Sequence, residues 1–211
     1  MVPAAPRHLK ARKTPRQARA AVTLDAIFEA TIQLLVANGP KRLTTTRVAD
    51  RAGVSVGTMY QYFPHKEALL YALNERYLEA LSEKIEATCR AHHRAPLEVM
   101  IVALIETYWI AKTERADVTR ALYRAAVELD NETLIESFAT RVDTATLDMI
   151  ASAPDWNGTD LVSVNITLVT VIFGAIRNAF ERNLSPTLIE TLRVELLRMC
   201  RAYLLGFANT F

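Results

Sequence analysis

Hydroxyl, aromatic and basic side chains gather in one short stretch of the chain, LTTTRVADRAGVSVGTMYQYFPHK, residues 43–66. Hydroxyls and cations suit phosphate oxygens, and a small polar helix face suits the base edges of a DNA major groove. The stretch predicts two very short helices joined at Gly53, because glycine readily adopts the left-handed conformation that ends a helix. A purely structural hairpin has no use for so many exposed hydroxyls. The layout is typical of a helix-turn-helix DNA reader.

The spacing within this stretch predicts which side chains turn inward. Ser55 is placed to cap the second short helix, on which Met59 and Phe63 are expected to face the interior. The first short helix has one small apolar face, formed by Val48, Ala49 and Ala52. The second has a small polar outer face, formed by Gly57, Thr58, Tyr60 and Tyr62. An apolar stripe from Leu24 to Leu35, ending at Asn38-Gly39-Pro40, predicts a third helix that supports the two short ones.

The segment TTTRVADRAGVSVGTMYQYFPHKEAL, with LLVANG before it, closely resembles the DNA-binding signature of TetR-type transcriptional regulators. The resemblance covers about the first third of the chain, and the remainder is similar to the family only in length and helical pattern. It implies a homodimeric repressor whose variable C-terminal domain binds a small-molecule effector and thereby moves two DNA-reading heads. Two heads related by a two-fold axis would read a near-palindromic double-stranded operator.

The resemblance also implies roles for individual residues of the head. Those expected to hold phosphates are Thr45, Thr46, Tyr60, Tyr62 and Lys66, those expected to face base edges are Val56, Gly57 and Thr58, and possible additions are Ser55 and His65. Val56 lies where a longer polar side chain could have bonded a base, so thymine methyl contacts and DNA shape are expected there. His65 stands where the family often has a small capping residue.

Helical periodicity continues through the rest of the chain, which predicts an all-α fold. A long helix is expected from Lys66 to Thr88, and shorter stripes follow it. Between Leu161 and Phe180 apolar residues occupy nearly every side of a helix, so burial against more than one neighbour is expected. Ser185 and Pro186 are expected to begin the final helix. The apolar helix 161–180 and this final helix would pair with the same two helices of a second copy and form a four-helix homodimer interface. The alternative is one large monomeric core.

Charge and composition divide the chain into three predicted segments. Residues 1–66 hold 11 Lys or Arg against 3 Asp or Glu, whereas residues 67–211 hold 14 against 20, which together give the net charge of +2. The segments are a basic flexible arm at 1–19, a helix-turn-helix DNA-binding domain at 20–66 and a ligand-binding and dimerisation domain at 67–211. The arm can lie along phosphates or enter a minor groove, or it can be only a solubilising tail.

Other classes of function find little support in the residues. No phosphate-binding glycine loop, GxSxG or HExxH motif is present, so neither an enzyme nor a cofactor is expected. Cys89, His92 and His93 have metal-ligand chemistry, but solvated histidines and packed thiols are the expected reading, without a metal. No apolar run approaches membrane-spanning length, and no signal peptide is recognisable, so a cytoplasmic protein without membrane contact is expected.

An effector would bind among the middle helices and the apolar helix 161–180. Apolar walls and polar groups suited to such a pocket come from seven residues: Tyr108, Trp109, Tyr123, Phe138, Asn165, Phe173 and Arg177. Each of these residues can equally belong to the packed core or to the rim of an interface. The mixture favours an apolar or aromatic effector with one or two polar handles. The competing hypothesis is an architectural or protein-partnered DNA-binding protein that senses no small molecule.

Overall fold

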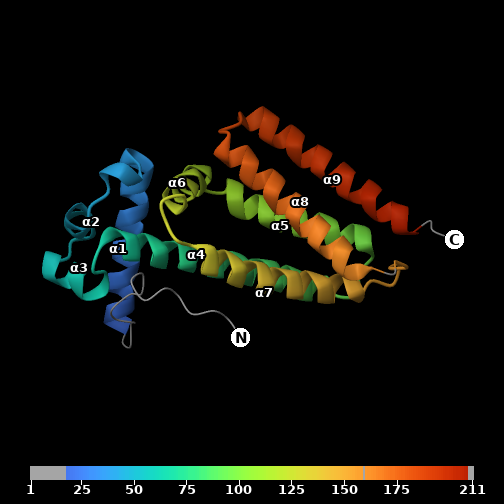
Figure 1. The fold of residues 1–211 in the computed structure, drawn as a ribbon, viewed down its shortest axis with the longest axis horizontal. Helices are drawn as coiled ribbons and strands as arrows, with labels where there is room; N and C mark the ends of the chain where they lie inside the picture. The colour runs from blue at the N-terminus through green and yellow to red at the C-terminus, as the bar shows by residue number, and fades with distance from the viewer. Residues whose placement is uncertain (1–17, 159, 209–211) are drawn as a thin grey trace. The chain divides into compact units, whose positions relative to one another are not determined.

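The structure, a computed structural model, describes residues 18–158 and 160–208 (Figure 1). Every regular element in these ranges is helical, which confirms the predicted fold class. The elements are α1 (Ala18–Asn38), the 3-10 turn η2 (Pro40–Arg42), α2 (Thr45–Ala52), α3 (Val56–Tyr62), α4 (Lys66–Ala91), α5 (Leu97–Thr113), α6 (Ala116–Ala126), α7 (Glu132–Ala151), α8 (Leu161–Glu181) and α9 (Pro186–Ala208).

The described residues fall into two compact units. The first runs up to Leu78 and includes Asp117–Ile135; the second comprises Glu79–Ala116 and the residues from Glu136 onward. Helices α4 and α7 therefore contribute to both units. The functional boundary after residue 66 stays a prediction. Because α1 begins at Ala18, the last two residues of the predicted arm are helical, and the rest of the arm lies outside the described residues.

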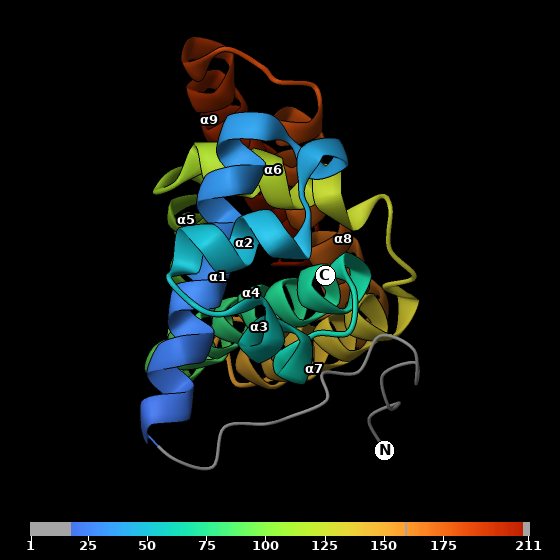
Figure 2. The same ribbon diagram turned by 90° about the vertical axis from the view of Figure 1, so that its left-hand side faces the viewer.

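The first unit has its own apolar core. Ile27 of α1, Val48 of α2 and Met59 of α3 are fully buried together, and the start of α4 adds Leu69. Figure 2 shows α1 running beside α2 and α3. One side of α6 joins the same core, including Leu122. The two short helices are therefore held by burial against longer ones, because helices of seven or eight residues are not stable alone.

The second unit is built around α5, α8 and α9. Ile101, Leu104 and Ile105 of α5 and Ile172 and Ile176 of α8 are fully buried. Helix α9 packs on both α5 and α8 (Figure 1). As predicted, α9 begins at Pro186, and the Ser185 hydroxyl accepts a hydrogen bond from the backbone N–H of Leu188 (3.3 Å).

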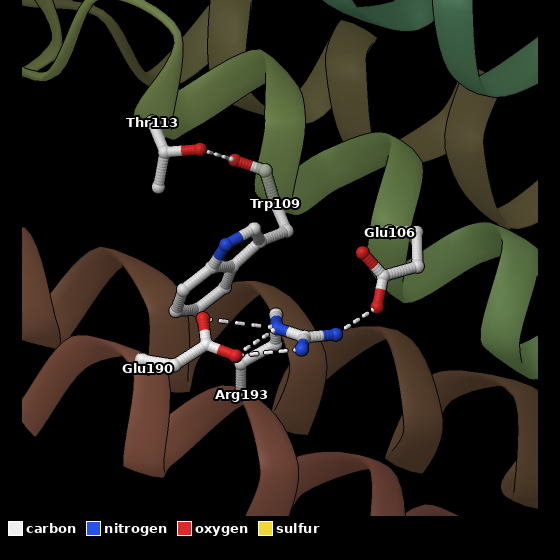
Figure 3. A network of polar contacts seen from close by, with 5 residues as sticks. All are labelled: Glu106, Trp109, Thr113, Glu190 and Arg193. Carbon is white, nitrogen blue, oxygen red and sulfur yellow. Dashed lines mark hydrogen bonds and ion pairs between the residues drawn. The ribbon is translucent and has the colours of Figure 1, made fainter. Parts of the chain in front are cut away.

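Polar contacts also join α5 to α9 (Figure 3). The Arg193 guanidinium of α9 pairs with Glu106 of α5 and with Glu190 one turn earlier on α9. Trp109 lies beside this pair, and its backbone carbonyl accepts a hydrogen bond from the Thr113 hydroxyl (2.8 Å). Because Arg193 is held by two carboxylates at once, this network fixes how α9 lies along α5.

Two described helices are long and apolar enough to cross a membrane by length and composition alone. They are residues 20–38 of α1 and the whole of α8, each with a mean hydropathy of 1.6. The expectation that no stretch approaches such a length is therefore wrong. In α1 the apolar character has a packing reason, because Ile27 and Leu35 are buried in the core of the first unit. In α8 apolar residues occupy both the buried and the exposed sides.

Candidate functional site

Backbone caps set the geometry of the α2-turn-α3 segment. Thr44 accepts a hydrogen bond from the backbone N–H of Arg47 (3.3 Å) at the start of α2, and Gly53 ends that helix with φ 67°. A Cβ on Gly53 would meet no atom within 4 Å, so the left-handed backbone rather than crowding calls for glycine. The Ser55 hydroxyl accepts from the N–H of Thr58 (3.0 Å) and caps α3. The predictions for Gly53 and Ser55 are confirmed.

The outer face of α3 carries small side chains. Val56 and Gly57 are exposed, and the Thr58 hydroxyl lies 2.9 Å from that of Ser55. A Cβ on Gly57 would have only the Ser55 hydroxyl near it, at 3.8 Å, so the helix backbone itself is open to solvent here. Such a face allows close approach to a DNA groove and offers few long side chains for reading bases.

Tyr60 and Tyr62 lie on opposite sides of α3. Tyr60 is 44% exposed, whereas Tyr62 is only 5% exposed and packs with Phe63 in the core, their ring centroids 6.3 Å apart. The expectation that Tyr62 stays on the outer face is therefore wrong. The reason is helical geometry: Tyr62 follows the buried Met59 by three positions, which places both on one side of the helix. Met59 and Phe63 face inward, as predicted.

The threonines at the start of α2 also differ in exposure. Thr46 is exposed, but Thr45 is buried and its hydroxyl donates to the Tyr60 hydroxyl (3.5 Å). This contact joins the beginning of α2 to α3 and orients the Tyr60 ring at the surface. Burial leaves little of Thr45 within reach of a phosphate, so its expected phosphate contact is not carried into the proposal below.

His65 caps α4 with its ring. The imidazole Nδ1 accepts a hydrogen bond from the backbone N–H of Ala68 (3.2 Å), the geometry of an N-cap. An accepting Nδ1 places the proton of the neutral ring on Nε2, which can donate outward. Nδ1 also lies 3.2 Å from Glu67 Oε2. Lys66 Nζ lies 3.8 Å from Glu128 Oε2, so it would leave this carboxylate to reach a phosphate.

Four exposed cations near α2 were not singled out from the sequence: Lys41, Arg42, Arg47 and Arg51. Arg47 donates to the backbone carbonyl of Arg42 (2.7 Å), and Arg51 donates to the Gln33 side chain of α1 (2.9 Å). The charge excess of the first 66 residues was the available signal. These two contacts hold the Arg47 and Arg51 guanidinium groups against the first unit.

Three of the predicted effector-site residues come together in the second unit. The Tyr108 and Phe173 rings are stacked, with centroids 4.1 Å apart, and Phe138 lies 5.9 Å from Phe173. Tyr108 is buried, while Phe138 and Phe173 are half-buried. These rings form an aromatic cluster contributed by α5, α7 and α8.

Asn165 lies elsewhere on α8 and is 3% exposed. Its amide donates to the backbone carbonyl of Asp143 on α7 (3.3 Å). The Oδ1 atoms of Asn165 and Asp143 are buried without a hydrogen-bond partner among the described residues. Burial also raises the pKa of Asp143. Two unsatisfied acceptors in one place suit a water molecule or a ligand that donates hydrogen bonds.

The remaining predicted effector residues are not part of the aromatic cluster as described. Trp109 lies beside Arg193 and Glu190 on the side of α5 that meets α9 (Figure 3). Arg177 is exposed and pairs with Glu181 one turn later (2.7 Å). Tyr123 belongs to the first compact unit, whereas the cluster belongs to the second. Their assignment to an effector stays a prediction.

Lys112 was missed from the sequence and adjoins the cluster. It is 1% exposed, and its Nζ lies 5.1 Å from the centroid of the Tyr108 ring. Burial, and then the positive charge of Arg177, lower the pKa of Lys112 to about 7. The available signal was spacing, because Lys112 follows Tyr108 by four positions and therefore shares its helix face.

The cysteines and histidines fit packing roles. Cys89 and Cys200 are free and buried, and burial raises the pKa of each thiol to about 11. His92 Nδ1 lies 2.9 Å from the carbonyl oxygen of Thr88, and His93 Nε2 lies 3.8 Å from an Asp148 oxygen. Within the described ranges, no three His, Cys, Asp or Glu side chains gather as metal ligands.

Helices α8 and α9 leave apolar side chains uncovered in the single chain. Ile166 is 55% exposed, and other exposed apolar residues of these helices are Val162, Leu188, Val194 and Met199. A recess of about 230 Å³ lies between the two helices, lined by Thr167, Leu168, Val171, Met199, Cys200 and Tyr203. An exposed apolar surface of this kind is typical of a protein interface.

Comparisons with known proteins agree with this architecture. Residues 27–73 match the family model for bacterial regulatory proteins of the tetR family. The nucleoid occlusion factor SlmA of Haemophilus ducreyi is 29% identical over 177 residues, 83% of this chain and 80% of that protein. The HTH-type transcriptional repressor KstR of Rhodococcus jostii is 30% identical over 129 residues, 61% of this chain and 54% of that protein.

A solved structure extends the likeness beyond the head. The TetR transcription regulator of Haloarcula marismortui shares the fold with a TM-score of 0.70 and 23% identity, over 86% of this chain and 98% of that one. The capped helix-turn-helix with its small outer face therefore lies within a segment that is similar to the bacterial regulatory proteins of the tetR family, and the fold is shared with a solved TetR transcription regulator.

Proposed function

We propose that the protein is an effector-responsive repressor that binds a near-palindromic operator as a cytoplasmic homodimer. The outer face of α3 is the observation that carries this proposal, because a capped helix with exposed Val56, Gly57 and Tyr60 is suited to a major groove. A small apolar or aromatic effector in the second unit would release the operator.

Base reading is assigned to Val56, Gly57 and Thr58, and phosphate contacts to Thr46, Tyr60 and Lys66. The first three are small, so thymine methyl contacts and sequence-dependent DNA shape would supply much of the selectivity. The His65 ring can add a phosphate contact through Nε2 while Nδ1 caps α4. Tyr62 is left out of this interface because it is buried.

Homodimer formation is assigned to α8 and α9. Their exposed apolar side chains, Ile166 and Met199 among them, would be covered by the same helices of a second copy in an isologous four-helix arrangement. The two recognition helices would then meet half-sites one helical turn apart, or a multiple of that distance.

The effector is assigned to the aromatic cluster of Tyr108, Phe138 and Phe173. Helix α4 contributes residues to both units, so its displacement could carry a change from the effector to the head. Operator release requires that the effector bind the two conformations with different affinity, and operator DNA must weaken effector binding by the same factor. A coupling of about 2 kcal/mol changes operator affinity about thirtyfold.

A second candidate is a protein-partnered DNA-binding function without a small-molecule effector. It is supported by the similarity to SlmA, a protein named for nucleoid occlusion, over most of both chains. The two candidates share the DNA interface and differ in what the second unit binds.

Selection from random DNA tests the DNA-binding proposal. We expect a palindromic motif, and we expect Thr58→Ala to change the preferred half-site. Tyr60→Phe and Lys66→Ala should weaken binding to operator and unrelated DNA alike. Lys66→Ala should also reduce, by about one, the steepness with which the logarithm of the binding constant falls with the logarithm of the salt concentration. If the selection recovers no palindromic motif, the proposal of a dimeric repressor is contradicted. A thermal-shift screen in which no small molecule stabilises the protein would favour the protein-partnered candidate.

A further inference from the structure

The lysine assigned to a DNA phosphate is held by a carboxylate of the same compact unit. Lys66 Nζ, at the start of α4, lies 3.8 Å from Oε2 of Glu128, which follows the end of α6 by two residues. The two side chains are only 29% and 37% exposed, so water screens their attraction less than on an open surface. Among the residues that the structure describes, no second carboxylate pairs with Lys66.

Packing fixes the backbone that carries Glu128. Leu122 of α6 is buried in the core of the first unit, and Leu129, next to Glu128, packs against the same core. The backbone N–H of Glu128 donates to the carbonyl of Ala125 (3.2 Å) and so satisfies one of the last carbonyls of α6. The carboxylate is therefore presented to Lys66 by a backbone that is anchored both before and after it.

A DNA phosphate would compete with Glu128 for the Lys66 ammonium. If the ammonium leaves the carboxylate to reach the phosphate, the attraction between Lys66 and Glu128 is lost. If the ammonium contacts both anions at once, the carboxylate and the phosphate come close together and repel each other. Both routes lower the affinity of the head for DNA, so the carboxylate opposes binding in either geometry.

We propose that Glu128 restrains DNA binding: its carboxylate competes with a DNA phosphate for Lys66 and so sets the strength of that contact. The inference rests on the phosphate contact proposed for Lys66, and it adds a positioning residue that lies outside the helix-turn-helix. Because a phosphate contact carries no base sequence, Glu128 lowers the affinity for every duplex by a similar factor. The end of α6 thereby takes part in the control of DNA affinity.

Three substitutions in the full-length protein separate this contact from general electrostatics. Glu128→Gln keeps the shape of the side chain and removes its charge, whereas Glu128→Asp keeps the charge and draws the carboxylate back from Lys66. Glu132→Gln removes the same charge from an exposed position at the start of α7 and is the matched control. The probe is a duplex of random sequence, about 30 base pairs long, titrated at low salt by fluorescence anisotropy.

We expect Glu128→Gln and Glu128→Asp each to tighten binding about two- to fivefold, the range for a partly exposed ion pair. Glu132→Gln should tighten binding less, because it removes only a long-range repulsion. In a Lys66→Met background, Glu128→Asp should have no effect and the gain from Glu128→Gln should fall, whereas the gain from Glu132→Gln should be unchanged. Circular dichroism checks folding, and either Glu128 variant tests the inference if the other does not fold.

Two results would overturn the inference alone. Weaker binding by Glu128→Gln would mean that the carboxylate holds Lys66 in place for the phosphate. A gain from Glu128→Gln that persists undiminished in the Lys66→Met background would mean that general repulsion is its cause. In both cases the DNA contact of Lys66 still stands if Lys66→Met by itself weakens binding. If Lys66→Met leaves the affinity unchanged, that contact and the restraint by Glu128 fail together, and selection from random DNA still decides the repressor proposal.

Discussion

Replacing Lys112 by methionine should change the stability of the protein in a way that depends on pH, with the substitution most favourable at low pH. Lys112 is buried, and burial with the charge of Arg177 lowers its pKa from the usual 10.5 to about 7. Below pH 7 the folded protein must hold a buried charge, whereas methionine fills similar space without one. Above pH 7 the folded protein holds the neutral amine, and the gain from the substitution should shrink.

The size and sign of the effect follow from proton binding. At 1.36 kcal/mol per pKa unit, the lowered pKa corresponds to at most about 5 kcal/mol of lost stability while the ammonium is charged. Between pH 7 and pH 10.5 the unfolded chain binds the proton and the folded chain does not, so the free energy of unfolding rises with pH. From pH 6 to pH 9 the gap between Lys112→Met and the unmodified protein should narrow by about 2 to 3 kcal/mol.

Urea unfolding followed by circular dichroism at pH 6, 7, 8 and 9 would measure this gap. Protein concentration is held constant, because the stability of a dimer depends on it. Taking the difference between the two proteins removes the contribution of other titrating groups. Lys84→Met, at an exposed site, should show a small gap that does not vary with pH. A gap for Lys112→Met that stays constant from pH 6 to pH 9, or that changes in the opposite direction, would refute the reasoning.

Three further substitutions test local features. Gly53→Ala should destabilise the protein by about 1 kcal/mol in thermal unfolding, because φ is 67°, and Gly53→Asn should cost less. His65→Ala should lower the free energy of unfolding by about 1 kcal/mol, because it removes the cap of α4, whereas His65→Asn should keep most of that stability. Equal stability of the His65→Ala and His65→Asn variants would exclude the cap. Ile166→Glu should give a folded monomer by light scattering, while Val127→Glu, at another exposed position, should leave the dimer intact.

The sequence alone determined those features that depend on neighbours within a few residues. Gly53 ends α2 and Ser55 caps α3 because both tasks use a residue's own backbone or a hydrogen bond three positions along. Apolar periodicity similarly predicted the positions of the long helices, and the charge excess of the first 66 residues coincides with the helix-turn-helix segment. Sequence reasoning placed Tyr108 and Phe173 in one candidate effector site but did not predict that their rings stack.

Tertiary structure alone decided which side chains are buried and what they contact. The spacing of three positions between Met59 and Tyr62 puts both on one side of α3, but how far burial extends along that side, to a Tyr62 that sequence reasoning left outside, depends on the packing of the neighbouring helices in the first unit. Leu122 of α6 joins the core of the first unit although the helix lies far along the chain. Lys112 carries its lowered pKa because folding removes water from its ammonium and brings Arg177 of another helix near. Interactions between distant segments are absent from the local sequence, because they arise only when the helices pack.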